Sequence, residues 1–160
     1  MNRSILLRGV CAALLVATGL AGCANYGGAA GQQLFDATLS GSQEVPAATT
    51  AGSGKANVRY NPSTTMLSWS VTHSGLSGPV TAAHIHGPAA VGANAVPIVP
   101  FDVTGAGASG TLTGTFTQTS FVTIPPDSLD KLMTSGNAYV NLHTAANAAG
   151  EIRGQLSRQP

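Results

Sequence analysis

From Leu34 onwards the chain consists of short segments in which apolar and polar residues alternate, separated by Gly, Pro and Asn. Successive side chains of a β-strand point to opposite faces, so this period of two predicts strands with one buried face. We expect strands at residues 34–40, 54–60, 65–73, 80–86, 96–103, 110–117, 137–144 and 150–157. Asn61-Pro62-Ser63 is a turn sequence that would join the second and third strands into a hairpin. The pattern predicts an all-β sandwich or small barrel of about eight strands.

Residues 125–136 depart from this alternation. Three apolar residues in the segment have helical spacing: Leu129, Leu132 and Met133. Asp127 or Ser128 can cap the first turn of a helix, and Gly136 suits its C-terminal end. One short helix that crosses between strands is therefore expected.

The amino terminus has the layout of a secretory signal peptide. Arg3 and Arg8 precede a mostly apolar run from Val10 to Leu20. This run is too short to cross a bilayer, which needs about 20 apolar residues. We expect residues 1–22 to form a signal peptide that is removed on export.

The end of that run, Leu20-Ala21-Gly22-Cys23, resembles the lipobox of bacterial lipoproteins. The resemblance implies that the thiol of Cys23 is diacylated and that the chain is cut just before it. The alternative is an ordinary secreted protein, cut near Ala21 or Gly22, in which Cys23 is a free thiol. The other cysteine, Cys11, lies in the discarded segment, so the mature chain can form no internal disulfide.

The mature chain is expected to have two parts. Residues 23–33 comprise the lipidated Cys and a flexible tether of small and polar residues, and residues 34–157 form the β domain.

Removing the signal peptide leaves five Lys or Arg against six Asp or Glu, so nothing here attracts nucleic acid. The lipid would hold the protein at the membrane of the bacterial cell envelope. Ala24 after the Cys, rather than Asp, resembles lipoproteins that are sorted to the periplasmic side of an outer membrane, if the host has one.

Residues separated by an even number of positions in a strand point to the same face. Comparing the positions of the histidines with those of the apolar residues therefore predicts which face each histidine is on. The apolar residues expected to face the core are Ile85, Val140, Leu142, Ile152 and Leu156. The polar residues on the opposite face, which we expect on the outer surface of the sheet or its rim, are His84, His86, His143, Glu151 and Arg153. His73 differs because it continues the core face of its strand, so we expect it to be packed by the core.

His84 and His86 form an H-x-H pair, which sets two imidazoles about 7 Å apart along one face of a strand. Imidazole suits copper and zinc, and the absence of an evident thiolate or Met ligand favours Cu(II) or Zn(II). With His143 on the shared face, these residues are candidate ligands of one ion, and His73 is a less suitable fourth candidate. The alternative is that they are polar residues on an exposed strand.

Several stretches of the chain resemble the chordin-type domain, CHRD, of bacterial exported proteins and animal chordins. They are Leu39–Pro46, Ala83–Ala89, Tyr139–Thr144, Asn147 and Gly150–Leu156. The resemblance covers about Leu34 to Leu156, which is essentially the whole mature domain. The biochemical role of this family is poorly defined, so the resemblance identifies a domain more than an activity.

A more remote similarity is to the copper-zinc superoxide dismutases, which are exported Greek-key β-barrels. It implies that His84, His86 and His143 match three of four copper ligands, and that Arg153 matches the anion-guiding arginine with an offset of one residue. This chain has no evident counterpart of the bridging His, of the zinc loop or of the disulfide. The similarity leaves open either a mononuclear copper site of these three histidines or the same scaffold without any metal. In the metal-binding hypothesis, Arg153 or Glu151 supports the ligands.

Two functions are therefore carried forward. The first is a site for one copper or zinc ion, with redox or superoxide-related activity if a coordination position stays open. The second is a metal-free module of the cell envelope that binds a protein or glycan partner. For Arg153 and Glu151 the alternative role is a cross-strand salt bridge, or charges that protect an edge strand. Classical hydrolysis is excluded because no carboxylates are paired and no G-x-S-x-G sequence occurs.

Overall fold

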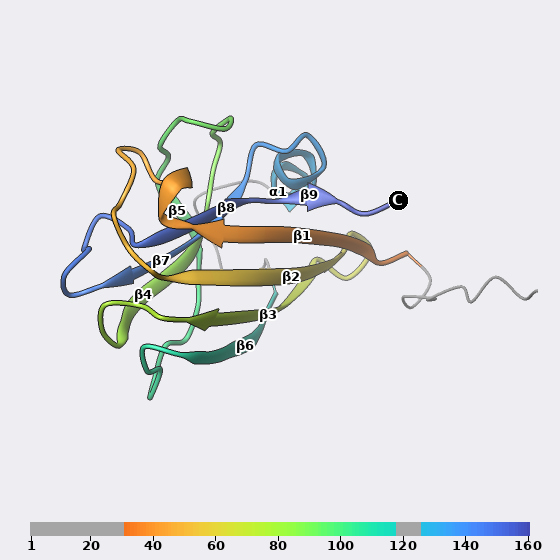
Figure 1. Cartoon of the computed structure of the whole chain (residues 1–160). Coiled ribbons are helices and arrows are strands. Elements are labelled where there is room, and N and C mark those ends of the chain that lie inside the picture. The colour runs from red at the N-terminus through yellow and green to blue at the C-terminus, as the bar shows by residue number, and fades with distance from the viewer. Residues whose placement is uncertain (1–30, 118–125) are drawn as a thin grey trace, which may run out of the picture.

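The strands form one curled antiparallel sheet in the part of the chain that the structure describes, residues 31–117 and 126–160 of a computed structural model (Figure 1). They are β1 (Gln33–Ser40), β2 (Ser53–Asn61), β3 (Met66–Ser74), β4 (Val80–His86), β5 (Pro97–Pro100), β6 (Gly110–Thr117), β7 (Tyr139–Thr144), β8 (Ile152–Gln155) and β9 (Ser157–Arg158). The order across the sheet is β5-β4-β7-β8-β1-β2-β3-β6, and β9 pairs with β1. The prediction of an all-β domain is confirmed.

Each expected strand coincides with an observed one, and the last expected segment contains β8 and the start of β9. The predicted hairpin is also confirmed, because β2 and β3 pair in antiparallel register from Ser53 to Asn61. At its turn the amides of Ser63 and Thr64 donate hydrogen bonds to Oδ1 of Asn61, at 2.9 and 3.2 Å. The side chain of Asn61 thus supplies the acceptor that this tight connection needs.

The core lies on the concave side of the curled sheet and is built from the apolar face of nearly every strand. The five residues that were predicted to face it are all at most 1% exposed: Ile85, Val140, Leu142, Ile152 and Leu156. The rings of Trp69 and Phe101 stack with their centroids 4.3 Å apart. Phe101 follows β5, which lies at one end of the strand order, whereas Trp69 lies on β3 near the other end. This contact therefore packs the two ends of the curled sheet against each other.

The predicted helix is present as α1 (Pro126–Thr134), beside β9 (Figure 1). Leu129 and Met133 are buried. Gly136 has a φ of +70° and ends the helix as expected: its amide donates to the carbonyl of Met133, and the next amide donates to the carbonyl of Leu132. The predicted cap by Asp127 or Ser128 remains untested, since the residues before Pro126 and the side chain of Asp127 lie outside the described part.

The signal peptide, Cys23 and most of the tether lie outside the described residues. Within the described ranges, no helix has the length and the apolar character that a membrane crossing would require.

Candidate metal centre

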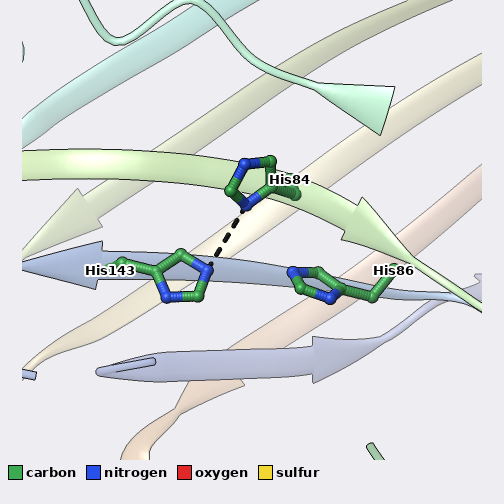
Figure 2. A group of neighbouring side chains, drawn as sticks. All are labelled: His84, His86 and His143. Carbon is green, nitrogen blue, oxygen red and sulfur yellow. Dashed lines mark hydrogen bonds between the residues drawn. The ribbon is translucent and has the colours of Figure 1, made fainter. Parts of the chain in front are cut away.

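The three candidate ligands come from two neighbouring strands. β4 and β7 pair in antiparallel register, so that His84 lies opposite Asn141 and His86 opposite Tyr139, while His143 lies opposite Ala82. All three histidines point away from the core, as their parity predicted, and toward one another (Figure 2). One ring nitrogen from each lies within 4.8 Å of the corresponding nitrogens of the other two. The structure therefore brings together the three histidines that were predicted to share one face of the sheet.

The hydrogen bonds of two rings determine which nitrogen is free. Nδ1 of His86 lies 2.9 Å from the carbonyl oxygen of Ala95, and Nδ1 of His143 lies 3.1 Å from that of Ala148. A carbonyl oxygen can only accept, so each Nδ1 carries the hydrogen and each Nε2 keeps its lone pair. Nε2 of His86 is buried without a partner, and Nε2 of His143 lies 3.4 Å from Nδ1 of His84. A ligand histidine is commonly oriented in this way, by donating its other N–H to a carbonyl.

The surroundings keep all three imidazoles neutral near pH 7. Burial lowers the pKa of His86 to about 4, although its hydrogen bond to Ala95 acts in the opposite direction. Burial and the neighbouring His143 lower the pKa of His84. Burial also lowers the pKa of His143, although its hydrogen bond to Ala148 acts to raise it. Neutral imidazole is the form that coordinates a metal, so the site is prepared for an ion at ordinary pH.

The expectation that this face is exposed is wrong. His86 and His143 are 7% and 9% exposed, and only His84 is half-buried. The reason is that residues 41–50 and 87–96 fold back over the face, where the backbone of Ala95 contacts His86. The two segments are joined to each other, because the side chain amide of Asn94 donates to the carbonyl of Val45 at 2.7 Å. The candidate ligands therefore line a covered site that reaches the surface at His84.

Arg153 is buried below this cover and is 2% exposed. Its Nη2 donates to the carbonyl of Ala93 at 2.8 Å, and its Nη1 to Oδ1 of Asn94 at 3.2 Å. Its Cζ lies 3.4 Å from the ring centroid of Tyr139, which in turn stacks on His86 with the centroids 4.8 Å apart. Arg153 therefore contacts the covering segment and, through Tyr139, a candidate ligand, whereas the sequence placed it on an open surface.

Glu151 is also fully buried and is not an exposed edge-strand charge. Its carboxylate accepts hydrogen bonds from the hydroxyls of Thr50, Ser77 and Thr144 and from the amide of Ser77, at 2.5 to 2.7 Å. Burial acts to raise the pKa of Glu151, but these hydrogen bonds outweigh it and lower the pKa to about 2. The partners of Glu151 are thus hydroxyl and amide donors, and Arg153 is not among them. Glu151 ties together three segments that are distant in the sequence.

The family model of the CHRD domain matches residues 35–156, from β1 to the end of the core. The chain belongs to the CHRD-domain family. The match includes all three histidines of the candidate site. No curated protein and no solved structure matches the chain.

This CHRD domain also contains a buried acidic residue that the sequence analysis did not select. Glu44, 8% exposed, follows the short 3-10 helix Gly41–Gln43 and receives a hydrogen bond of 3.4 Å from Nδ2 of Asn141. Burial raises its pKa to about 7, while Arg153 and Asn141 act to lower it. Glu44 lies outside every strand, so alternation could not place it. The sequence feature that could have drawn attention to Glu44 was its position in Leu39–Pro46, a stretch that resembles the beginning of the CHRD domain.

His73 lies on β3, apart from the cluster of His84, His86 and His143. It is 5% exposed, as expected for a residue packed by the core. Its Nε2 lies 3.1 Å from the carbonyl oxygen of Gly107. Among the described residues, the cluster able to hold a metal comprises His84, His86 and His143 and does not include His73.

Proposed function

We propose that this protein is a lipid-anchored CHRD-domain protein of the bacterial cell envelope that binds one copper ion, or a zinc ion in its place, through His84, His86 and His143. The observation that carries the proposal is the convergence of three neutral imidazoles, each with one ring nitrogen directed at its neighbours, within 4.8 Å. Three nitrogen ligands without a thiolate are a set that suits copper and zinc.

The surrounding residues support binding in three ways. The carbonyls of Ala95 and Ala148 fix the rings of His86 and His143 with the metal-binding nitrogen inward. Arg153 and Tyr139 hold the segment that carries Ala95, since Arg153 bonds to Ala93 and Asn94 and the Tyr139 hydroxyl lies 3.1 Å from the amide of Ala95. In this proposal a coordination position stays open on the side of His84, which is the least buried of the three histidines.

The proposed activity follows from that open position. Copper supplies one-electron redox chemistry when it is bound, so a superoxide-related or other redox reaction is the activity to examine first. In this proposal Arg153 positions the ligands and does not guide anions, because its guanidinium is buried and donates hydrogen bonds to Ala93, Asn94 and Gln155.

The test of metal binding is calorimetric titration of the untagged protein with Cu(II) and Zn(II). Sub-micromolar binding that weakens at least about 100-fold in both His84→Ala and His143→Ala would support the shared site. His73→Gln is the matched control, since it removes an imidazole outside the cluster and should leave the affinity unchanged. Binding that is micromolar or weaker, and equal in both variants, would overturn the proposal and leave the metal-free envelope module. A superoxide assay on the copper-loaded protein then tests the activity.

The membrane anchor is proposed from the signal layout and the lipobox that ends at Cys23. Two or more acyl chains suffice to hold a protein on a membrane without a basic patch. Cys23→Ser should move the protein from the membrane fraction to the soluble fraction after cell breakage. Retention of the variant in the membrane fraction would argue against lipid attachment at this residue.

A further inference from the structure

Two buried oxygen atoms lie without a partner close to the histidine cluster. His84, Asn141 and Arg153 are neighbours across β4, β7 and β8, because Asn141 is opposite His84 on one side and opposite Arg153 on the other. Glu44 reaches this row from the covering segment and meets Asn141. Oε1 of Glu44 and Oδ1 of Asn141 are both buried and make no hydrogen bond. The two side chains are thus joined through Nδ2 of Asn141 and Oε2 of Glu44, while the other oxygen of each lacks a donor, and an unsatisfied buried acceptor is costly.

A proton on the Glu44 carboxyl would provide a donor at this pair of side chains. The carboxyl is well placed to hold one, because burial raises the pKa of Glu44 to about 7. Glu151, the other buried carboxyl among the described residues, differs because four hydrogen bonds satisfy it as an anion and lower its pKa to about 2. Glu44 is therefore the buried acid of this face that can change its charge near neutral pH.

A divalent ion would alter the charge of this face substantially. Arg153 on β8 already places one fixed positive charge there, and the imidazoles of His84 and His86 on β4 and of His143 on β7 add none while neutral. A bound ion adds two positive charges in a region that water enters poorly. Charges interact more strongly there than in bulk water, so the ionised form of a neighbouring carboxyl is favoured.

We infer that binding of a divalent ion at the three histidines expels the proton of Glu44, so that the Glu44 carboxylate offsets part of the incoming charge. The inference rests on the proposed function. The step breaks the O–H bond of the carboxyl, releases one proton to solvent and involves no electron transfer. Glu44 acts through its charge and not as a ligand, because it is not part of the cluster of ligand atoms.

The experiment counts protons. Zn(II), which has no redox chemistry, is titrated into the untagged protein in buffers of different ionisation enthalpy at pH 6.0 and pH 8.5. Wild type should release about one more proton per zinc than Glu44→Gln at pH 6.0, and the two should release equal numbers at pH 8.5. Between pH 5.5 and 6.5 the zinc affinity of wild type should accordingly rise about tenfold more than that of the variant. Asp102→Asn, which removes an exposed carboxyl that is ionised throughout, should match wild type.

Zinc binding with equal proton release by wild type and Glu44→Gln at pH 6.0 would overturn the inference while leaving the metal site intact. Failure of wild type to bind either Zn(II) or Cu(II) would overturn the proposed function, and the inference with it; if only Cu(II) binds, the same proton count is made with Cu(II). A second measurement does not depend on folding of the variant: the infrared difference spectrum of wild type on zinc addition at pH 6.0 should lose a protonated carboxyl band and gain carboxylate bands. An unchanged protonated carboxyl band would also overturn the inference.

Discussion

Glu151 should stabilise the fold more than any other acidic residue in the described part of the chain. Its carboxylate accepts four hydrogen bonds from donors on three separate segments: Thr50, Ser77 and Thr144. The pKa of about 2, against an ordinary value of 4.5, corresponds to about 3 kcal/mol of preference for the folded state when the group is ionised. Glu151→Gln keeps the size of the side chain but cannot accept from all these donors. We therefore expect it to lower the free energy of unfolding by about 3 kcal/mol at pH 7.

The pH dependence of this effect has a definite sign. A carboxyl with a lowered folded pKa stabilises the protein above its unfolded pKa, and that stability is lost as the pH falls from 4.5 toward about 2. The difference between wild type and Glu151→Gln should therefore shrink to less than about 1 kcal/mol at pH 2.5. Urea unfolding followed by circular dichroism at pH 7 and pH 2.5 measures both values. Asp102→Asn, a change at an exposed carboxyl, should stay within about 0.5 kcal/mol of wild type. A Glu151→Gln protein as stable as that control at pH 7 would refute the reasoning.

Three further predictions concern the core, the covering segment and the histidines. Gly114→Ala should destabilise the protein by about 1–3 kcal/mol in thermal unfolding, because a Cβ at this position would lie 2.3 Å from Cζ2 of Trp69. Tyr139→Phe should cost about 1 kcal/mol in urea unfolding of the metal-free protein, because the hydroxyl that meets the amide of Ala95 at 3.1 Å is lost. The metal-free wild type should lose stability relative to His86→Ala as the pH falls from 6.5 to about 4, since unfolded His86 takes up a proton before folded His86 does; urea unfolding of the two proteins across this range measures the difference.

The strands and the facing of their side chains could be predicted because both follow from a local rule. Alternation placed Ile85, Val140 and Leu142 in the core, and the same parity put His84, His86 and His143 on the opposite face. The position of the helix end was also local, since a glycine at 136 can adopt the positive φ that stops α1. None of these features requires knowledge of contacts between distant segments.

The burial of the site could not be predicted, because it depends on where two irregular segments pack. Nothing in the sequence of residues 87–96 indicates that Ala95 contacts His86, or that Arg153 fixes Ala93 and Asn94. Glu44 was missed for the same reason, since it belongs to the other covering segment. The charge and protonation of the site residues depend on this cover, so a strand pattern alone identifies the candidate ligands but not their surroundings.

Under the proposed function, the separation of the candidate ligands along the chain determines when an ion can be acquired. His84 and His143 are 59 residues apart, and they meet only because β4 pairs with β7. An unfolded or incompletely synthesised polypeptide therefore presents at most the H-x-H pair, without the third nitrogen beside it. Under the proposed function, the metal content of the finished protein should therefore reflect the ions available where folding is completed.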